Sequence, residues 1–188
     1  MESRCCRIEH MDEPYMTVIG SHLYGTSHAK SDLDLCLVLP IHHGEDQKRI
    51  GNIDLTLIGF AQFANKVRSG IPRTLDALFA TPINALPEAL RELIPQIDFS
   101  QAITTHKRTA TAYLVEDIPK NRVHAQRVIG NLQTLVHTGS YDPHLTADQI
   151  AHYRRVVDWT AEDWGQYIIP LILETEKDMR RLLSDAKH

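Results

Sequence analysis

The chain has 188 residues, of which 43% are hydrophobic and 23% are charged, and its formal net charge is −4. This composition suits one compact domain or a catalytic core with a helical extension, and the acidic balance argues against broad, non-specific binding of nucleic acid. No apolar run is long enough to cross a membrane, the first fifteen residues lack a signal-peptide pattern, and the three cysteines cannot supply a paired disulfide framework, so we expect a cytoplasmic protein with no membrane partner.

The first predicted element is a short buried strand from Met16 to Ile19, which Gly20 and Ser21 follow directly. A Gly-Ser turn after such a strand can present backbone N–H groups and a hydroxyl to phosphate oxygens. Gly25 and Thr26 are expected to end the short helix that comes next, which is a structural role rather than a ligand contact.

The second apolar run, Leu33 to Leu39, predicts another strand, and Asp32 and Asp34 stand at its start. Side chains two residues apart on a strand point to the same face, so both carboxylates can reach one hard cation such as Mg²⁺ or Mn²⁺. Ser31 precedes this acidic pair. Two roles stay open for its hydroxyl, a hydrogen bond to phosphate or a turn contact.

A third strand is predicted at Asn52–Ile58, after a polar connection from Ile41 to Gly51. Its apolar residues alternate on one face and leave Asp54 on the other. Asp46 and Asp76 are two further acidic residues nearby in the sequence.

The rest of the chain has helical periodicity. Gly139 is expected to cap one of the predicted helices, capping boxes at Thr146–Gln149 and Thr160–Asp163 begin two more, and Pro170 should kink or restart the last one. A short apolar segment at 74–80 should pack on the core. Apolar spacing and terminal signals predict helices at residues 60–69, 87–94, 103–115 and 119–138.

The expected fold class is thus α/β, in the α+β sense. A small mixed β-sheet forms a catalytic core at residues 1–95, and a helical C-terminal region at residues 96–188 packs on that core.

A basic group falls on the predicted helix 119–138. Lys120, His124 and Arg127 are spaced by four and three residues and therefore share one helix face. They can line a triphosphate or an acceptor's phosphates, or they can form a solvated basic face, and both interpretations stay open. The 11 histidines show no zinc-binding spacing, and the chain has no P-loop motif.

The passage GSHLYGTSHAKSDLDLCLVLP, residues 20–40, resembles the signature of the DNA polymerase β-like nucleotidyltransferase superfamily. That signature is a strand, Gly-Ser, a short helix and Asp-x-Asp on the next strand. Residues 60–79 and 120–139 are also similar to a subfamily of predicted nucleotidyltransferases from bacteria and phages. The chain departs from that subfamily at Arg73, where a small polar residue is usual, and at Asp76, where Glu is expected.

The resemblance implies a two-metal-ion nucleotidyltransferase. The family needs a third carboxylate on a following strand, for which Asp54 is the preferred candidate and Asp46 and Asp76 are alternatives. Asp32 and Asp34 would bridge the Mg²⁺ or Mn²⁺ ions, and Asp54 would bind the catalytic ion and help deprotonate the acceptor. Gly20 and Ser21 would hold the β- and γ-phosphates of a nucleoside triphosphate. The nucleoside monophosphate would pass to an acceptor hydroxyl with release of pyrophosphate.

The acceptor stays open, because small members of this superfamily modify RNA such as a tRNA end, other nucleic acids including DNA, protein hydroxyls or small molecules. Two alternative functions also stay open. One is an antitoxin-like minimal nucleotidyltransferase that modifies a partner protein. The other is a nucleotide-binding module without catalytic activity.

Overall fold

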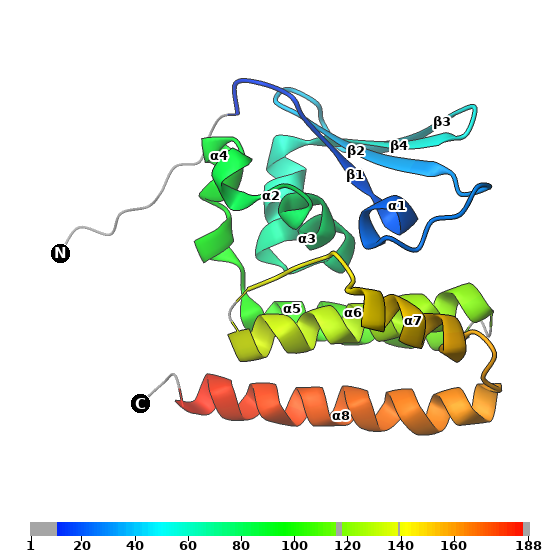
Figure 1. Cartoon of the computed structure of the whole chain (residues 1–188). Helices are drawn as coiled ribbons and strands as arrows, with labels where there is room; N and C mark the ends of the chain where they lie inside the picture. The colour runs from blue at the N-terminus through cyan, green and yellow to red at the C-terminus, as the bar shows by residue number, and fades with distance from the viewer. Residues whose placement is uncertain (1–10, 116–117, 139, 186–188) are drawn as a thin grey trace.

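A computed structural model describes residues 11–115, 118–138 and 140–185 of the chain. It has an α+β fold, in which a four-stranded mixed sheet precedes a mostly helical C-terminal half (Figure 1). In chain order the elements are β1 (Tyr15–Ile19), α1 (Gly20–Tyr24), β2 (Leu33–Leu39), β3 (Glu45–Ile50), β4 (Ile53–Gly59), α2 (Phe60–Arg68), α3 (Pro72–Phe79), η1 (Ile83–Ala85), α4 (Glu88–Arg91), η2 (Ile94–Gln96), α5 (Phe99–Val115), α6 (Pro119–Thr138), α7 (Ala147–Val156) and α8 (Ala161–Asp185).

The sheet has the strand order β1-β2-β4-β3. β2 and β4 are parallel, and the outer strands β1 and β3 each run antiparallel to their neighbour. The register sets Asp34 beside Asp54 across the parallel pair, and Ile19 beside Asp34 across the β1–β2 pair. The Gly-Ser turn that follows Ile19 therefore meets the two carboxylates at one end of the sheet.

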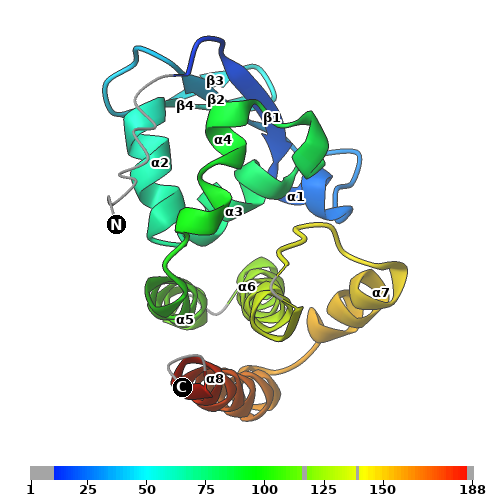
Figure 2. The same ribbon diagram turned by 90° about the vertical axis from the view of Figure 1, so that its left-hand side faces the viewer.

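The two faces of the sheet have different surroundings. On β1, Tyr15, Thr17 and Ile19 are buried, whereas the alternating Met16 and Val18 are exposed. Helices α2 and α3 lie against the inner face, and α4 lies to one side of α2 (Figures 1 and 2). In the described part of the chain, no helix covers the outer face. The strand register sets Asp34 and Asp54 on the inner face, so the helices beneath it shape their surroundings.

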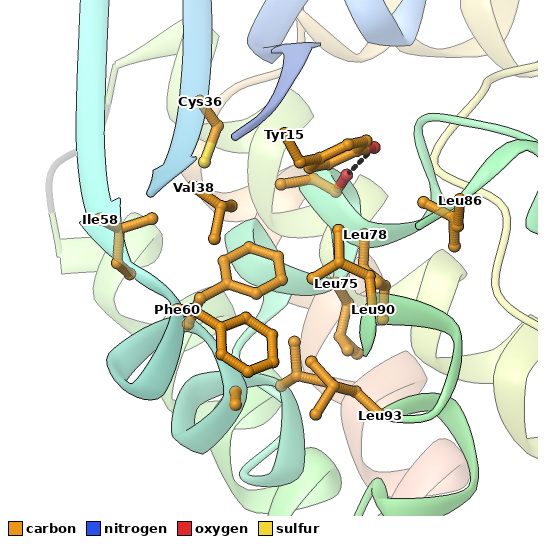
Figure 3. Packing of buried hydrophobic residues seen from close by; sticks show 14 of the residues in the cluster. Tyr15, Cys36, Val38, Ile58, Phe60, Leu75, Leu78, Leu86, Leu90 and Leu93 are labelled. Carbon is orange, nitrogen blue, oxygen red and sulfur yellow. Dashed lines mark hydrogen bonds between the residues drawn. The ribbon is translucent and has the colours of Figure 1, made fainter. Parts of the chain in front are cut away.

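The main core lies between the inner face and α2–α4 (Figure 3). Val38 and Ile58 of the two central strands meet Phe60, Leu75 and Leu78, and all five side chains are buried. Burying each such side chain contributes roughly 1.5–3 kcal/mol relative to leaving it exposed. This packing fixes β2 and β4, and through them the positions of the acidic side chains at their ends.

The helical half has a separate buried cluster. Ala125, Val128 and Ile129 of α6 pack with Trp164 and Ile168 of α8. Seen end-on, α5 and α6 form a layer beneath α2 and α3, with α8 on its far side (Figure 2). Helix α6 therefore buries one side in this cluster, and its other side faces the sheet. Among the described residues, no helix has the length and apolar character needed to span a bilayer.

Most of the predicted elements are confirmed, and three differ. The expected polar connection at 41–51 contains strand β3, because hydrogen bonding to β4 orders six exposed residues that carry no apolar alternation. The helix expected at 87–94 is confined to Glu88–Arg91. Helix α8 continues through Pro170 and does not restart there, since Ile168 and Ile172 on either side are buried and outweigh the lost backbone bond.

Both predicted capping boxes are present. The Thr146 hydroxyl accepts from the backbone N–H of Gln149 while the Gln149 side chain accepts from Thr146, and Thr160 and Asp163 make the same reciprocal pair. The cap expected at Gly139 falls outside the described residues. The division of the chain at residue 95 stays a prediction.

Candidate functional site

A cleft of about 530 Å³ opens between the end of the sheet and helices α6 and α7, and a cavity of about 200 Å³ adjoins it. All nine residues that the sequence singled out border these two spaces. Ser31, Asp32 and Asp54 line the cleft, Gly20 and Arg127 line the smaller cavity, and both share Ser21, Asp34, Lys120 and His124.

Gly20 lies directly against the carboxylate of Asp34. Its φ of 70° is in the left-handed region, and a Cβ atom there would stand 2.1 Å from Asp34 Oδ2. Any other residue at position 20 would displace the carboxylate or the turn. The glycine of the sequence motif is thus required by the close approach of the turn to the acidic site.

The carboxyl group of Asp34 has a perturbed pKa. Burial raises its pKa above the ordinary value, and the neighbouring Asp54 and Asp32 carboxylates add to that rise. Arg73 and Lys120 act in the opposite direction. The ionised form of Asp34 is therefore costly unless more positive charge arrives, which is the condition of a site that binds cations.

Asp32 and Asp54 share one cationic partner. Arg49 of β3 donates from Nη2 to Asp32 Oδ1 over 2.8 Å, and its Nη1 lies 3.6 Å from Asp54 Oδ1. The three side chains are 60%, 40% and 39% exposed, in the order Arg49, Asp32, Asp54. These carboxylates are thus open to solvent and bridged by a side chain that can move.

The two alternatives for the third carboxylate lie elsewhere. Asp46 pairs with Leu57 across β3 and β4, and alternation sets it on the outer face of the sheet, opposite to Asp54. Asp76 is fully buried beneath the site. Only Asp54, of these three, lines the cleft with Asp32 and Asp34.

Asp76 is the centre of a buried polar network. Its carboxylate accepts two hydrogen bonds from Arg127 Nη1, at 3.0 and 3.1 Å, and one each from the hydroxyls of Tyr24 and Tyr141, both at 2.7 Å. The Arg127 guanidinium also lies over the Tyr24 ring, 3.7 Å from its centroid. Arg127 therefore borders the cavity with a guanidinium that is already held by the protein, and Tyr24 is a core residue.

Two other residues of the basic group face the site more freely. Lys120 is exposed at the start of α6 and borders both spaces. His124 stacks on Tyr113, with ring centroids 5.4 Å apart. Burial, reinforced by the positive charges of Arg127 and Lys120, lowers the pKa of His124 to about 4. At neutral pH the imidazole of His124 is therefore uncharged.

Ser31 closes a turn. Its hydroxyl accepts a hydrogen bond of 2.9 Å from the backbone N–H of His28, and its own N–H donates to the His28 carbonyl oxygen. This contact fixes the loop that leads into Asp32. The side chain also borders the cleft, so a contact to phosphate stays a prediction.

The donor set suits a hard divalent cation. Asp32, Asp34 and Asp54 supply carboxylate oxygens only, which Mg²⁺ and Mn²⁺ prefer to sulfur or imidazole ligands. Within the residues described, no three His, Cys, Asp or Glu side chains stand close enough to form a ready-made metal site. The guanidinium of Arg49 instead supplies the positive charge between two of these carboxylates. These residues fit a divalent ion such as Mg²⁺ or Mn²⁺, and the three aspartates are the ones that would hold it.

Two arginines at the site had no functional prediction. Arg73 borders the smaller cavity and donates to Thr56 Oγ1 at 3.3 Å, and together with Arg49 it lines a third cavity beside Asp34 and Asp54. Arg73 stood out in the sequence only as a departure from the family pattern. Arg49 carried no signal, because it lies in the strand that was expected to be a loop.

Sequence comparison adds no relative. No protein-family model matches the chain, and no curated protein matches it in sequence. What the protein does has to be inferred from the chemistry of its own residues.

Proposed function

We propose that this protein is a metal-dependent nucleotidyltransferase, which transfers a nucleoside monophosphate from a nucleoside triphosphate to an acceptor hydroxyl and releases pyrophosphate. One observation carries the proposal. Three half-exposed carboxylates at the ends of two parallel strands border the same cleft as a Gly-Ser turn, and that turn touches the central carboxylate. This is also the arrangement implied by the resemblance of residues 20–40 to the polymerase β-like superfamily.

The carboxylates would divide the work by position. Asp32 and Asp34, two residues apart, would share the bound ions, and Asp54, next to Asp34 in register, would contact the ion nearest the acceptor. Divalent ions held there would stabilise both the attacking and the leaving oxygen of an in-line displacement. Asp54 would accept the proton of the acceptor hydroxyl as the hydroxyl oxygen bonds to the α-phosphorus.

The smaller cavity suits the triphosphate. Gly20 and Ser21 form one wall, and Arg73, Lys120 and Arg127 bring positive charge to it. Negative charge accumulates on the β- and γ-phosphates as the bond to the α-phosphorus breaks, so cations there stabilise the transition state. Because His124 is uncharged at neutral pH, it would contribute a hydrogen bond rather than a charge.

The direct test is transfer of label. The protein is incubated with each α-labelled nucleoside triphosphate, with Mg²⁺ or Mn²⁺, and with separate fractions of total RNA, DNA, protein and metabolites. We expect label to enter one fraction and pyrophosphate to be released. Both signals should be lost in Asp34→Asn. They should persist in Asp46→Asn, a matched control that alters an exposed carboxylate on the outer face.

The labelled fraction identifies the acceptor class. Label in one co-purifying protein would favour the antitoxin-like alternative, in which the enzyme modifies a partner protein. Binding of a nucleoside triphosphate without release of pyrophosphate from any acceptor pool would replace the proposal with the non-catalytic binding module. Transfer that survives in Asp34→Asn would contradict the assignment of the site.

A further inference from the structure

Arg49 holds the position of a cation between two of the candidate metal ligands. It lies directly opposite Asp54 in the antiparallel register of β3 and β4, so its side chain emerges on the same inner face. From there its two terminal nitrogens reach Asp32, at 2.8 Å, and Asp54, at 3.6 Å. One guanidinium thus bridges carboxylates that come from different parts of the chain.

This ion pair is unlike one that stabilises a fold. The Arg49 side chain is 60% exposed, and pairs of exposed side chains in water contribute little to stability. The contrast is Arg127, which is 5% exposed and is held by the fully buried Asp76. An exposed pair can exchange partners at low cost, so the Asp32 and Asp54 carboxylates can release Arg49 when a stronger cation arrives.

The charges nearby explain why a cation is needed there at all. Asp32, Asp34 and Asp54 all line one cleft, and like charges gathered in this way repel one another. Arg73 lines the third cavity with Arg49, but among the described residues it makes no ion pair with Asp32 or Asp54, and one of its terminal nitrogens donates to Thr56 Oγ1. Without Arg49, the Asp32 and Asp54 charges would face each other across the cleft with no positive charge in contact, as far as the described residues show.

We propose that Arg49 is a built-in competitor for the metal site. Its guanidinium keeps Asp32 and Asp54 together in the metal-free protein, and a divalent ion binds by displacing it. Arg49 is therefore a positioning residue that weakens metal affinity and holds the ligands in place until the ion arrives. The inference rests on the proposed function in one respect, since it takes the three aspartates as the metal ligands.

The test is a titration with Mn²⁺ alone, with free ion measured by electron paramagnetic resonance and no nucleotide present. In Arg49→Gln, which keeps a hydrogen-bonding side chain but no charge, Mn²⁺ should bind about fivefold more tightly than in the unaltered protein, equivalent to about 1 kcal/mol. Arg49→Lys, which keeps the charge but cannot bridge with two nitrogens, should give an intermediate affinity.

A matched control separates displacement from a general effect of charge. Lys30 borders the same cleft two residues before Asp32, and among the described residues it has no ion pair with the three aspartates. Lys30→Gln removes the same charge without removing a competitor, so its Mn²⁺ affinity should change by less than about twofold. Melting temperatures of all variants, without metal, show that each is folded.

The outcomes separate the two proposals. If the unaltered protein binds Mn²⁺ and Asp34→Asn does not, the metal site stands, and equal or weaker binding by Arg49→Gln overturns the inference alone. An equal gain in Arg49→Gln and Lys30→Gln also overturns it, because charge without contact would then explain the change. If the unaltered protein binds no Mn²⁺, or binds it equally well as Asp34→Asn, the proposed function fails and the inference fails with it.

Discussion

The protein has two acidic groups a short distance apart, and they behave in opposite ways. Asp76 is completely buried and accepts hydrogen bonds from Arg127, Tyr24 and Tyr141. Asp32 and Asp54 are about two-fifths exposed and share one exposed arginine. A carboxylate whose partners are all supplied by the fold serves stability, whereas carboxylates left under-neutralised at a cleft are available to a ligand.

The same difference separates the basic residues. Arg127 lies at the wall of the smaller cavity but is held by Asp76. Burial is the largest single effect on its guanidinium and lowers the pKa, but Asp76 together with nearby tyrosines outweighs burial, so that the pKa is raised. Lys120 is exposed at the other end of the same helix face. Four predictions test whether the buried charges serve stability and the exposed charges at the cleft serve the proposed reaction.

The largest expected effect concerns Asp34. Asp34→Asn should reduce nucleotide transfer by at least about 10³-fold, because a site that stabilises the transition state by several kcal/mol loses a central ligand. Its melting temperature should stay unchanged or rise, since burial raises the pKa of Asp34 and makes its charged form costly at neutral pH. Labelled transfer and thermal unfolding measure the two effects, and a fall in both would make Asp34 a structural residue.

Asp76→Asn should have the reverse signature. It leaves the buried Arg127 charge without its counterion, which typically costs about 3–5 kcal/mol of unfolding free energy. Urea denaturation measures the loss. The double variant Asp76→Asn/Arg127→Gln is the control, because it removes both charges and should recover part of the stability. If the Asp76→Asn single variant is instead stable but transfers nucleotide poorly, Asp76 belongs to the proposed active site.

The folded protein should also lose stability in acid, because it buries a histidine. His106 is fully buried against Tyr141, and burial lowers the pKa of His106 to about 4. The folded state therefore binds fewer protons than the unfolded state as the pH falls below about 6.5. The stability that depends on an uncharged His106 is complete above about pH 6.5 and is lost as the pH falls towards 4. This loss is on the order of 3 kcal/mol.

Urea denaturation between pH 7 and pH 4 measures the slope of the unfolding free energy against pH. His106→Asn should flatten it, and His144→Asn, which changes an exposed histidine, should leave it as it is. Equal slopes in the unaltered protein and His106→Asn would show that other groups govern the acid sensitivity.

The smallest effect is expected at Lys120. Lys120→Ala should weaken binding of a nucleoside triphosphate about tenfold, with no change in melting temperature, because it removes one exposed charge beside the cavity. Isothermal titration calorimetry measures the affinity. Arg127→Ala is a poor test of the same idea, since it also breaks the buried pair with Asp76. Unaltered affinity in Lys120→Ala would remove Lys120 from the nucleotide site.

Much of the sheet was predictable because its signals are local. The continuous apolar runs around Ile19 and Cys36 and the alternating apolar residues around Leu55 each predicted a strand, and the structure has them as β1, β2 and β4. The spacing of Asp32 and Asp34 set both carboxylates on one face for the same reason. Strand β3 gave no such signal, because all six of its residues are exposed and its order comes from hydrogen bonds to β4.

The basic helix face was predictable only in part. The spacings of Lys120, His124 and Arg127 correctly set them on one side of α6, where all three border the smaller cavity. Their different states were not visible, because burial and partners come from distant segments. Asp76 lies 51 residues before Arg127, and no local pattern joins them.

Local spacing along the chain predicts three features of this protein: a glycine turn after a strand, two aspartates on one face of the next strand, and a basic face on a helix. Those features depend on neighbours within a few residues, which spacing reveals. Tertiary structure alone decided that Asp54 stands beside Asp34, that Arg49 bridges Asp32 and Asp54, and that Asp76 and Arg127 neutralise each other in the interior. Strand register and burial create those contacts, and both arise only when the whole chain packs.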